Sequence, residues 1–392
     1  MSAQRSQMDT LMATIEELSV EIGPRGSTSD EERRASEYVA NYLRTHGFET
    51  SIESFRSVTS FSWAFGIFFA AFVIAATLLA IGTPPLIPAL ISLLALIAFG
   101  LESSGIETIT RLLPQRPSQN VIGRIQPTTS ASHHVVVTAH VDSSRSALLW
   151  HPRIAGIFRP LLLLAIAAML LITILSIVAI FMPVLWPRLV AWIACIYIAC
   201  MLFILVDREF RGSITPGAND NASGVAVLLS LADSFATHPL APDTDVWLVA
   251  TGCEEAGTVG MLRFLQRHGN ELPKATTTFI NIDNVGAGEI TFTTAEGILL
   301  PLKTDPVLNE AAIAFAQNYP EYHVKGHGYH ALTTDAIIPL SKRRRAISIM
   351  AFDARGRLPN WHWHTDTIDN IDPETITIAR DLVAYVIRSI AW

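Results

Sequence analysis

The sequence has little charge and little cysteine. Of its 392 residues, 16% are Asp, Glu, Lys or Arg, whereas a typical soluble domain carries about 25%. Half of the residues are hydrophobic, so we expect part of the chain to contact lipid. The three cysteines are Cys195, Cys200 and Cys253, two of them inside an apolar run. This pattern excludes a disulfide framework and indicates a reducing compartment.

The sequence also lacks an excess of positive charge and the pattern of a signal peptide. Its formal net charge is −7, which argues against a nucleic-acid partner. Residues 1–23 mix charged and apolar side chains, and no basic start is followed by an uninterrupted apolar stretch. We therefore expect no cleaved export signal. Four apolar residues recur at helical spacing and predict an amphipathic helix instead: Leu11, Ile15, Leu18 and Ile22.

Long apolar runs are concentrated in two regions. Residues 61–101 carry no charge and are broken near the middle by Gly82-Thr83-Pro84-Pro85. The first half meets the requirement of about 20 apolar residues for a membrane span, and the second half is short. A second region runs from 160 to 206, with a break between Pro183 and Pro187. We interpret the two regions as two helical hairpins, which make four membrane spans.

These hairpins divide the chain into five segments and fix its orientation. Each hairpin returns the chain to the side it left, so all polar segments share one side. Arginines gather near the span ends on that side, whereas the opposite turns carry only Arg188; the positive-inside rule then places the polar domain in the cytoplasm of an integral, multi-pass membrane protein. The alternative, four buried helices of a soluble core, is disfavoured because such helices rarely lack charge over a full membrane thickness. The segments are the N-terminal part of the polar domain at 1–60, hairpin 1 at 61–101, the middle part at 102–159, hairpin 2 at 160–206 and the main part at 207–392.

The polar segments alternate between helical and strand patterns. This alternation predicts an α/β fold with a mixed, mostly parallel sheet flanked by helices, next to a four-helix transmembrane region. Helices are expected at 31–46, 221–236, 259–268, 305–317 and 373–390. Strands are expected at 120–125, 134–139, 245–251, 276–282 and 290–294.

Acidic and histidine residues follow the predicted strands, where catalytic groups collect in α/β sheets. His140 and Asp142 can share a face of an extended segment, and a ligating histidine needs an acceptor on its second nitrogen. Asp220 lies in a run of small residues at a helix start, where a simple helix cap is an equally good interpretation. Glu254 and Glu255 end an apolar strand, and paired buried carboxylates are costly unless they bind cations or protons.

Two further groups complete the pattern. Asp283 again follows a strand, and His364 lies in a Trp-His-Trp-His-Thr-Asp-Thr segment near the C-terminus. His362 precedes His364 by two residues, and we expect it to have a structural role. Together the clusters supply histidines and carboxylates suited to two Zn²⁺ ions per chain, about 3.5–4 Å apart and bridged by one carboxylate.

The ordered motifs resemble the M28 family of zinc peptidases. They are His-x-Asp, Gly-Ala-Asn-Asp-Asn-x-Ser-Gly, Glu-Glu-x-Gly, a strand-end Asp and His-Thr-Asp-Thr, and they span nearly all of the polar chain. The resemblance implies a zinc aminopeptidase-like fold and metal-assisted hydrolysis of peptide substrates. It also implies these roles: Asp220 bridging the ions, His140 and Asp283 completing one site, Glu255 and His364 the other, Glu254 as general base and Asp142 orienting His140.

The sequence departs from the family pattern in two places. His140 and Asp220 are 80 residues apart (220 − 140) because a predicted hairpin fills the interval, where the family has a short loop. Trp363 stands where many relatives have a tyrosine that helps to hold the oxyanion, and its indole offers only an N–H.

Several functions fit this pattern. We expect a membrane-embedded aminopeptidase with a bilayer and a peptide as its partners. The alternatives within catalysis are a carboxypeptidase or a glutaminyl-cyclase-like enzyme, which would use one zinc. The alternative outside catalysis is a membrane scaffold on the same fold, and loss of metal ligands would indicate it.

Overall fold

The computed structural model describes residues 2–182 and 185–390, and the chain forms two compact units. Unit 1 comprises residues 1–59, 116–146 and 214–392, and unit 2 comprises 60–115 and 147–213. The predicted break at Pro183 lies outside the described residues. Unit 2 is therefore made of two insertions into the sequence of unit 1.

Unit 1 is built on one mixed sheet. Its strand order is β1-β2-β4-β3-β5-β9-β6-β7, with β8 also paired to β6. The strands are β1 (Glu49–Ser57), β2 (Arg116–Ile125), β3 (His133–His140), β4 (Thr244–Thr251), β5 (Thr277–Ile282), β6 (Glu289–Glu296), β7 (Leu302–Lys303), β8 (Lys325–Tyr329) and β9 (Arg345–Phe352).

The centre and the edges of this sheet differ in direction. Strands β4, β3, β5 and β9 run parallel, whereas β1 and β2 on one side and β6 and β7 on the other add antiparallel pairs. Parallel pairs are thus four of the eight described pairings, counting β6 with β8. The mixed α/β sheet is confirmed, but the predicted excess of parallel pairs is confined to the centre.

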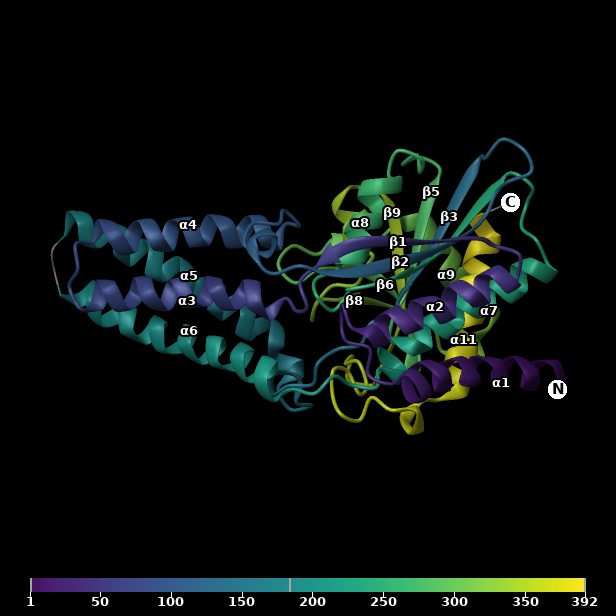
Figure 1. Cartoon of the computed structure of the whole chain (residues 1–392), viewed down its shortest axis with the longest axis horizontal. Helices are drawn as coiled ribbons and strands as arrows, with labels where there is room; N and C mark the ends of the chain where they lie inside the picture. Colours follow the sequence, from purple (N-terminus) through teal and green to yellow (C-terminus); the bar gives the residue numbers. More distant parts are fainter. Residues whose placement is uncertain (1, 183–184, 391–392) are drawn as a thin grey trace. The chain divides into compact units, whose positions relative to one another are not determined.

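Helices cover both faces of the sheet. Alternate residues of β3 point to opposite faces, so Val135 and Val137 join a cluster with α1, α2, α7, α9 and α11, while Val136 joins a cluster with α8 and α10. Figure 1 shows α2, α7 and α11 on one side of the sheet and α8 on the other. The helices are α1 (Ser2–Glu16), α2 (Asp30–Thr45), α7 (Ser223–Thr237), α8 (Val259–His268), α9 (Pro306–Asn318), α10 (Ile337–Ser341) and α11 (Pro373–Ile390).

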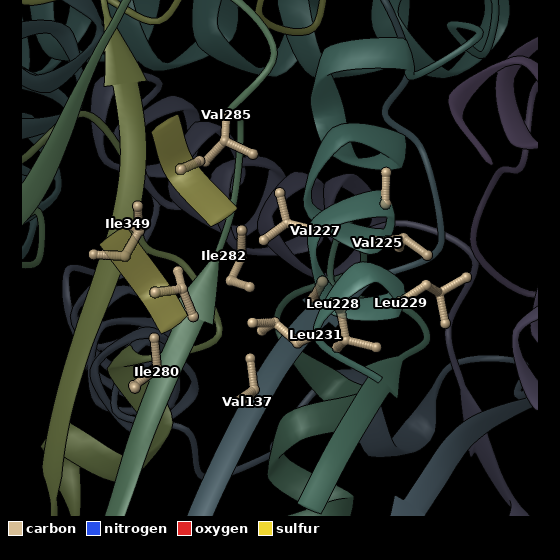
Figure 2. Packing of buried hydrophobic residues seen from close by; sticks show 14 of the residues in the cluster. Val137, Val225, Val227, Leu228, Leu229, Leu231, Ile280, Ile282, Val285 and Ile349 are labelled. Carbon is tan, nitrogen blue, oxygen red and sulfur yellow. The ribbon is translucent and has the colours of Figure 1, made fainter. Parts of the chain in front are cut away.

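The larger cluster is a continuous apolar core between α7 and the parallel strands. Leu228 and Leu231 of α7 pack toward Val137 and Ile280, and all four are buried (Figure 2). Burial of each such side chain stabilises the fold by about 1.5–3 kcal/mol. This packing holds rigid the strand ends from which the polar residues project.

Unit 2 consists of four long apolar helices. They are α3 (Ser62–Ala80), α4 (Leu86–Ser103), α5 (Phe158–Phe181) and α6 (Trp186–Arg211), and each is long and apolar enough to cross a membrane. They pack side by side, α3 against α4 and α6, and α5 against α4 and α6 (Figure 1). Short helical turns lie between these elements: Glu17–Ile22, Thr110–Leu112, Leu148–Trp150, Ala155–Ile157, Ala218–Ala222, Pro320–Tyr322 and Ile368–Asn370.

Candidate metal centre

His140 ends strand β3 and is almost fully buried, with 2% of its surface exposed. Its Nδ1 lies 3.0 Å from the main-chain oxygen of Asp142, which fixes the ring and leaves Nε2 pointing at other groups. Nε2 lies 3.2 Å from Oδ1 of Asp220 and 3.5 Å from Oδ1 of Asp283. The ends of the parallel strands β3 and β5 and the turn before α7 thus bring a histidine and two carboxylates together.

Asp220 lies in the irregular turn Ala218–Ala222 that precedes α7, and its bond to Asn221 is cis. The main-chain N–H groups of Asn219 and Asp220 donate to the carboxylate of Asp366, at 2.6 and 3.3 Å. This carboxylate holds the turn, so that both oxygens of Asp220 face histidines. The helix-cap alternative does not describe this residue, because its carboxylate contacts other parts of the chain.

Glu254 and Glu255 follow strand β4, and one carboxylate sets the position of both. The main-chain N–H groups of Glu254 and Glu255 each donate to Asp142, to Oδ1 and Oδ2 respectively, at 3.1 Å. Ser27 donates to the same carboxylate at 2.6 Å. Asp142 therefore contacts the segments of both His140 and the glutamate pair, a wider role than the predicted orientation of His140 alone.

The C-terminal segment contributes His362, where the sequence analysis expected His364. Nε2 of His362 lies 3.1 Å from Oδ2 of Asp220 and 3.1 Å from Oε1 of Glu255, and the ring is buried. His364 is exposed, and its ring packs against Trp363 at 4.6 Å. The structure thus places His362, and not His364, beside Asp220 and Glu255. The cause is a local turn in which His362 adopts a positive φ of 51° and points inward.

Two groups of residues could hold metal ions in the described part of the chain. One comprises His140, Asp220 and Asp283, and the other comprises Asp220, Glu255 and His362. Within each group the candidate ligand atoms lie within 4.8 Å of one another, and all are buried. Asp220 belongs to both groups, so it is the one carboxylate placed to bridge two ions. The structure brings together every sequence-predicted site residue except His364.

The donor set fits a divalent cation. Oδ2 of Asp220 and Oε1 of Glu255 are buried, and Nε2 of His362 lies 3.1 Å from each of them. Buried carboxylate oxygens grouped in this way are costly unless a cation pairs with them. Imidazole nitrogens together with carboxylate oxygens are ligands that suit zinc.

The electrostatics of the centre also favour cations. Burial opposes protonation of His140, but hydrogen bonds with Asp142, Asp220 and Asp283 outweigh burial and raise its pKa well above the ordinary value. Burial likewise opposes protonation of His362, yet the nearby charges of Glu255 and Asp220 raise its pKa to about 9. The same carboxylates that raise the pKa of these histidines would attract a metal ion, which would bind the histidines in their deprotonated form.

Glu254 is half-buried beside both groups. Burial raises the pKa of its carboxyl well above the ordinary value, and the charges of Glu255 and Asp335 add to this effect. A carboxyl with a raised pKa can accept and return a proton near neutral pH.

Sequence reasoning gave no role to some residues that hold the centre. Asp366 stood in the last motif without a role, and Ser27 was not singled out. The partners of both lie more than a hundred positions away, so no local pattern could have identified their contacts.

This chain is similar in sequence and in fold to known proteins. Residues 206–387 match the model of peptidase family M28. The chain is 17% identical to a zinc aminopeptidase from Bacillus subtilis, with a TM-score of 0.58 over 97% of this chain and 94% of that one. It is also 17% identical to a glutaminyl cyclase from Tannerella forsythia, with a TM-score of 0.55 over 97% and 98%.

The chain has the fold of the M28 zinc peptidases. Among relatives by sequence, the probable lipoprotein aminopeptidase LpqL of Mycobacterium tuberculosis is 25% identical over 197 residues, 44% of this chain and 39% of that protein. Aminopeptidase YwaD of Bacillus subtilis is 32% identical over 88 residues, 21% and 19% respectively. The chain thus aligns with well under half the length of these relatives.

Proposed function

We propose that this M28-like chain is a two-zinc metallopeptidase that removes N-terminal residues from peptides. The observation that supports this function is the pair of three-residue groups that share Asp220, with Glu254 beside them. In the proposed centre, His140 and Asp283 complete one site, while Glu255 and His362 complete the other. The ligand from the C-terminal segment is therefore His362 and not His364.

Each residue of the centre has a defined task in this proposal. Bound zinc would lower the pKa of a water molecule and polarise the scissile carbonyl. Glu254 accepts a proton from the attacking water at its carboxylate and later donates it to the nitrogen of the leaving amine. Asp142 keeps Glu254 and Glu255 in place through their main-chain N–H groups, at 3.1 Å each.

Release of amino acid from two matched peptides tests the function. The purified full-length chain, reloaded with zinc, receives a peptide with a free amino terminus and its N-acetylated twin. An aminopeptidase releases the first residue of the free peptide only. Glu254→Gln should abolish release, while Glu310→Gln, an exposed position on α9, should not change it.

Other outcomes of the same assay identify the alternatives. Cleavage of both peptides indicates another peptidase specificity, such as that of a carboxypeptidase. Release of ammonia from a peptide with N-terminal glutamine, without cleavage of either twin, indicates cyclase chemistry, and its fold is shared with this chain. Bound zinc without any reaction would favour a scaffold.

We also propose that α3 to α6 cross a lipid bilayer and that unit 1 lies in the cytoplasm. The length and apolar composition of these helices support this proposal, as do the arginines near the span ends on the side of the polar segments.

Chemical labelling in sealed vesicles tests the orientation. Asp30, whose side chain is 85% exposed, is replaced by cysteine in a Cys200→Ser background, because Cys200 is the exposed native cysteine and Cys195 and Cys253 are buried. An impermeant maleimide should label Asp30→Cys in inside-out vesicles and not in right-side-out ones. The reverse pattern would contradict a cytoplasmic unit 1, and release of the chain by alkaline carbonate would contradict membrane spanning.

A further inference from the structure

Arg25 lies outside every motif described so far, yet it is completely buried beneath the candidate metal centre. It follows the turn Glu17–Ile22 and precedes α2. We infer that Arg25 is a positioning residue: its guanidinium clamps the main chain before Asp220 onto the main chain beside His140. This inference rests on the two-zinc centre proposed above.

The contacts of the guanidinium reach three separate segments. Nε donates to the main-chain oxygen of Val141 at 2.8 Å. Nη1 donates to that of Pro216 at 2.7 Å, and Nη2 donates to that of Gly217 at 2.9 Å. Nη1 also lies 2.6 Å from the main-chain oxygen of Leu18 and 3.0 Å from that of Gly23, in its own segment, so its two hydrogens are shared among three acceptors. The planar fork of arginine can serve all these acceptors, whereas the ammonium of lysine has only three donors.

These acceptors are adjacent to the residues of the centre. Val141 stands between His140 and Asp142, and Gly217 comes three residues before Asp220. Both segments are 75 or more positions apart in sequence and separated by an insertion, so the covalent chain does not fix their spacing. The guanidinium contacts both main chains directly, next to the main-chain bond from the N–H of Thr215 to the oxygen of Ser144 at 2.8 Å. It holds the ends of the two segments that lead to His140 and Asp220.

Main-chain contacts reinforce this clamp. The N–H of Arg25 donates to Oγ of Ser143 at 2.9 Å, and the N–H of Ser143 donates back to the main-chain oxygen of Arg25 at 2.9 Å. Oγ of Ser143 donates in turn to the main-chain oxygen of Thr215 at 2.8 Å. The segment of Arg25 is therefore joined to both sides of the centre.

Gly217 shows how closely the guanidinium approaches the turn of Asp220. Its φ is +65°, and a Cβ at this position would lie 2.9 Å from Nη2 of Arg25 and 2.6 Å from the main-chain oxygen of Asp220. Any side chain would force the guanidinium and the turn apart, so this position needs glycine.

The charge of Arg25 and the hydrogen bonds of its guanidinium have opposite effects on metal binding. All five acceptors are neutral carbonyl oxygens, and the nearby negative charges belong to Asp366, Asp142 and Asp220. A cation close to these carboxylates repels an incoming metal ion. The hydrogen bonds of the guanidinium, by contrast, lower the free-energy cost of holding the proposed metal ligands in position. We infer that the geometric effect is the larger one, since groups that orient metal ligands contribute about 10- to 100-fold in affinity.

Arg25→Lys and Arg25→Met separate the two effects. Lysine keeps the charge but loses the fork, and methionine loses both. The zinc affinities of the full-length protein are measured by competition with a chromogenic chelator, and the visible absorption of the cobalt-substituted protein reports the ligand geometry. Arg344→Met is the matched control, because Arg344 also donates to two main-chain oxygens, of Leu272 and Gly269, away from the centre.

We expect both Arg25 variants to bind at least one zinc 10-fold or more weakly and to change the cobalt spectrum, while Arg344→Met does neither. Zinc affinity unchanged in Arg25→Lys, or increased in Arg25→Met, would overturn the inference. If neither variant folds, Ser143→Ala carries the test: several-fold weaker zinc binding supports the clamp, and unchanged binding contradicts it. A wild-type protein that binds fewer than two zinc ions would instead refute the proposed centre.

Discussion

The two units of this chain differ most in the side chains that they expose. In unit 1, large apolar residues such as Leu228, Phe235 and Leu382 fill the interior. In unit 2, the buried positions include small residues such as Ala76 and Ala194, and large apolar side chains cover the outside. Close packing through small residues is typical of helices in lipid, where burial of large apolar groups brings no gain. This difference is the one expected if unit 2 faces lipid, as proposed above, and unit 1 faces water.

Buried hydroxyl groups inside the apolar helices of unit 2 differ from the buried carboxylates at the candidate metal centre of unit 1. In unit 2, Thr173 and Ser176 each donate to the main-chain oxygen four residues earlier in the same helix. In unit 1, Asp142, Asp220 and Asp366 bind groups from distant parts of the chain. A hydroxyl group that donates to a main-chain oxygen of its own helix can be buried among apolar residues at little cost in stability. Carboxylates from distant parts of the chain that lie close together instead create a site for cations.

The largest expected effect is on the proton-transfer residue of unit 1. Glu254→Gln should lower kcat by about 10²- to 10⁴-fold, because general acid–base catalysis contributes that much, while both zinc ions remain bound. Steady-state kinetics and metal analysis of the same sample check this. Activity above a tenth of the wild-type value would mean that another group accepts the proton.

The two histidines of the C-terminal segment give the next largest contrast. His362→Ala should lose one zinc ion and lower activity at least about 100-fold, more than the usual effect of a residue that only orients a ligand. His364→Ala should keep two zinc ions and nearly full activity, because its ring is exposed. The opposite result for the pair would restore His364 as the ligand.

A charge introduced at an exposed apolar position should have different energetic costs in the two units. Ile193 in α6 is 72% exposed, and Leu300 in unit 1 is 80% exposed. Ile193→Arg should cost about 2.5–3.5 kcal/mol if the position faces lipid, whereas Leu300→Arg should change stability by less than about 0.5 kcal/mol. Membrane insertion assays and unfolding in detergent measure the two costs. Equal, small effects would indicate that unit 2 faces water.

The smallest expected effects come from two serines. Ser27→Ala removes the donor to Asp142 and should weaken zinc binding or activity by about 10-fold. Ser176→Ala removes a bond within one helix, and because that main-chain oxygen keeps its helical partner, stability should change by about 0.5 kcal/mol or less. A larger loss from Ser176→Ala would contradict the local satisfaction described for unit 2.

Much of the fold could be predicted because its signals are local. Strand β4 and helix α8 follow apolar runs and periodicity, and the predicted helix at 259–268 matches α8 residue for residue. Strand β1 was not predicted, because Glu49–Ser57 is an edge strand with mostly polar, exposed side chains. Its identity depends on pairing with β2, which a local pattern does not contain.

The site could be predicted only where position in the fold determines the role. Asp220, Glu255 and Asp283 follow strands or precede a helix, so their convergence follows from the fold. His362 and His364 each follow a tryptophan and are two residues apart, and only the local turn decides which one points inward. Arg25 carries no signal at all, since its partners are main-chain oxygens, which are alike at every position.

Anomalous X-ray scattering at the zinc absorption edge, on crystals of the full-length protein, tests the central claim most directly. The account predicts two zinc peaks about 3.5–4 Å apart, with Asp220 between them, His140 and Asp283 at one, and Glu255 and His362 at the other. A single peak, two peaks without Asp220 between them, or a peak bound by His364 would contradict it.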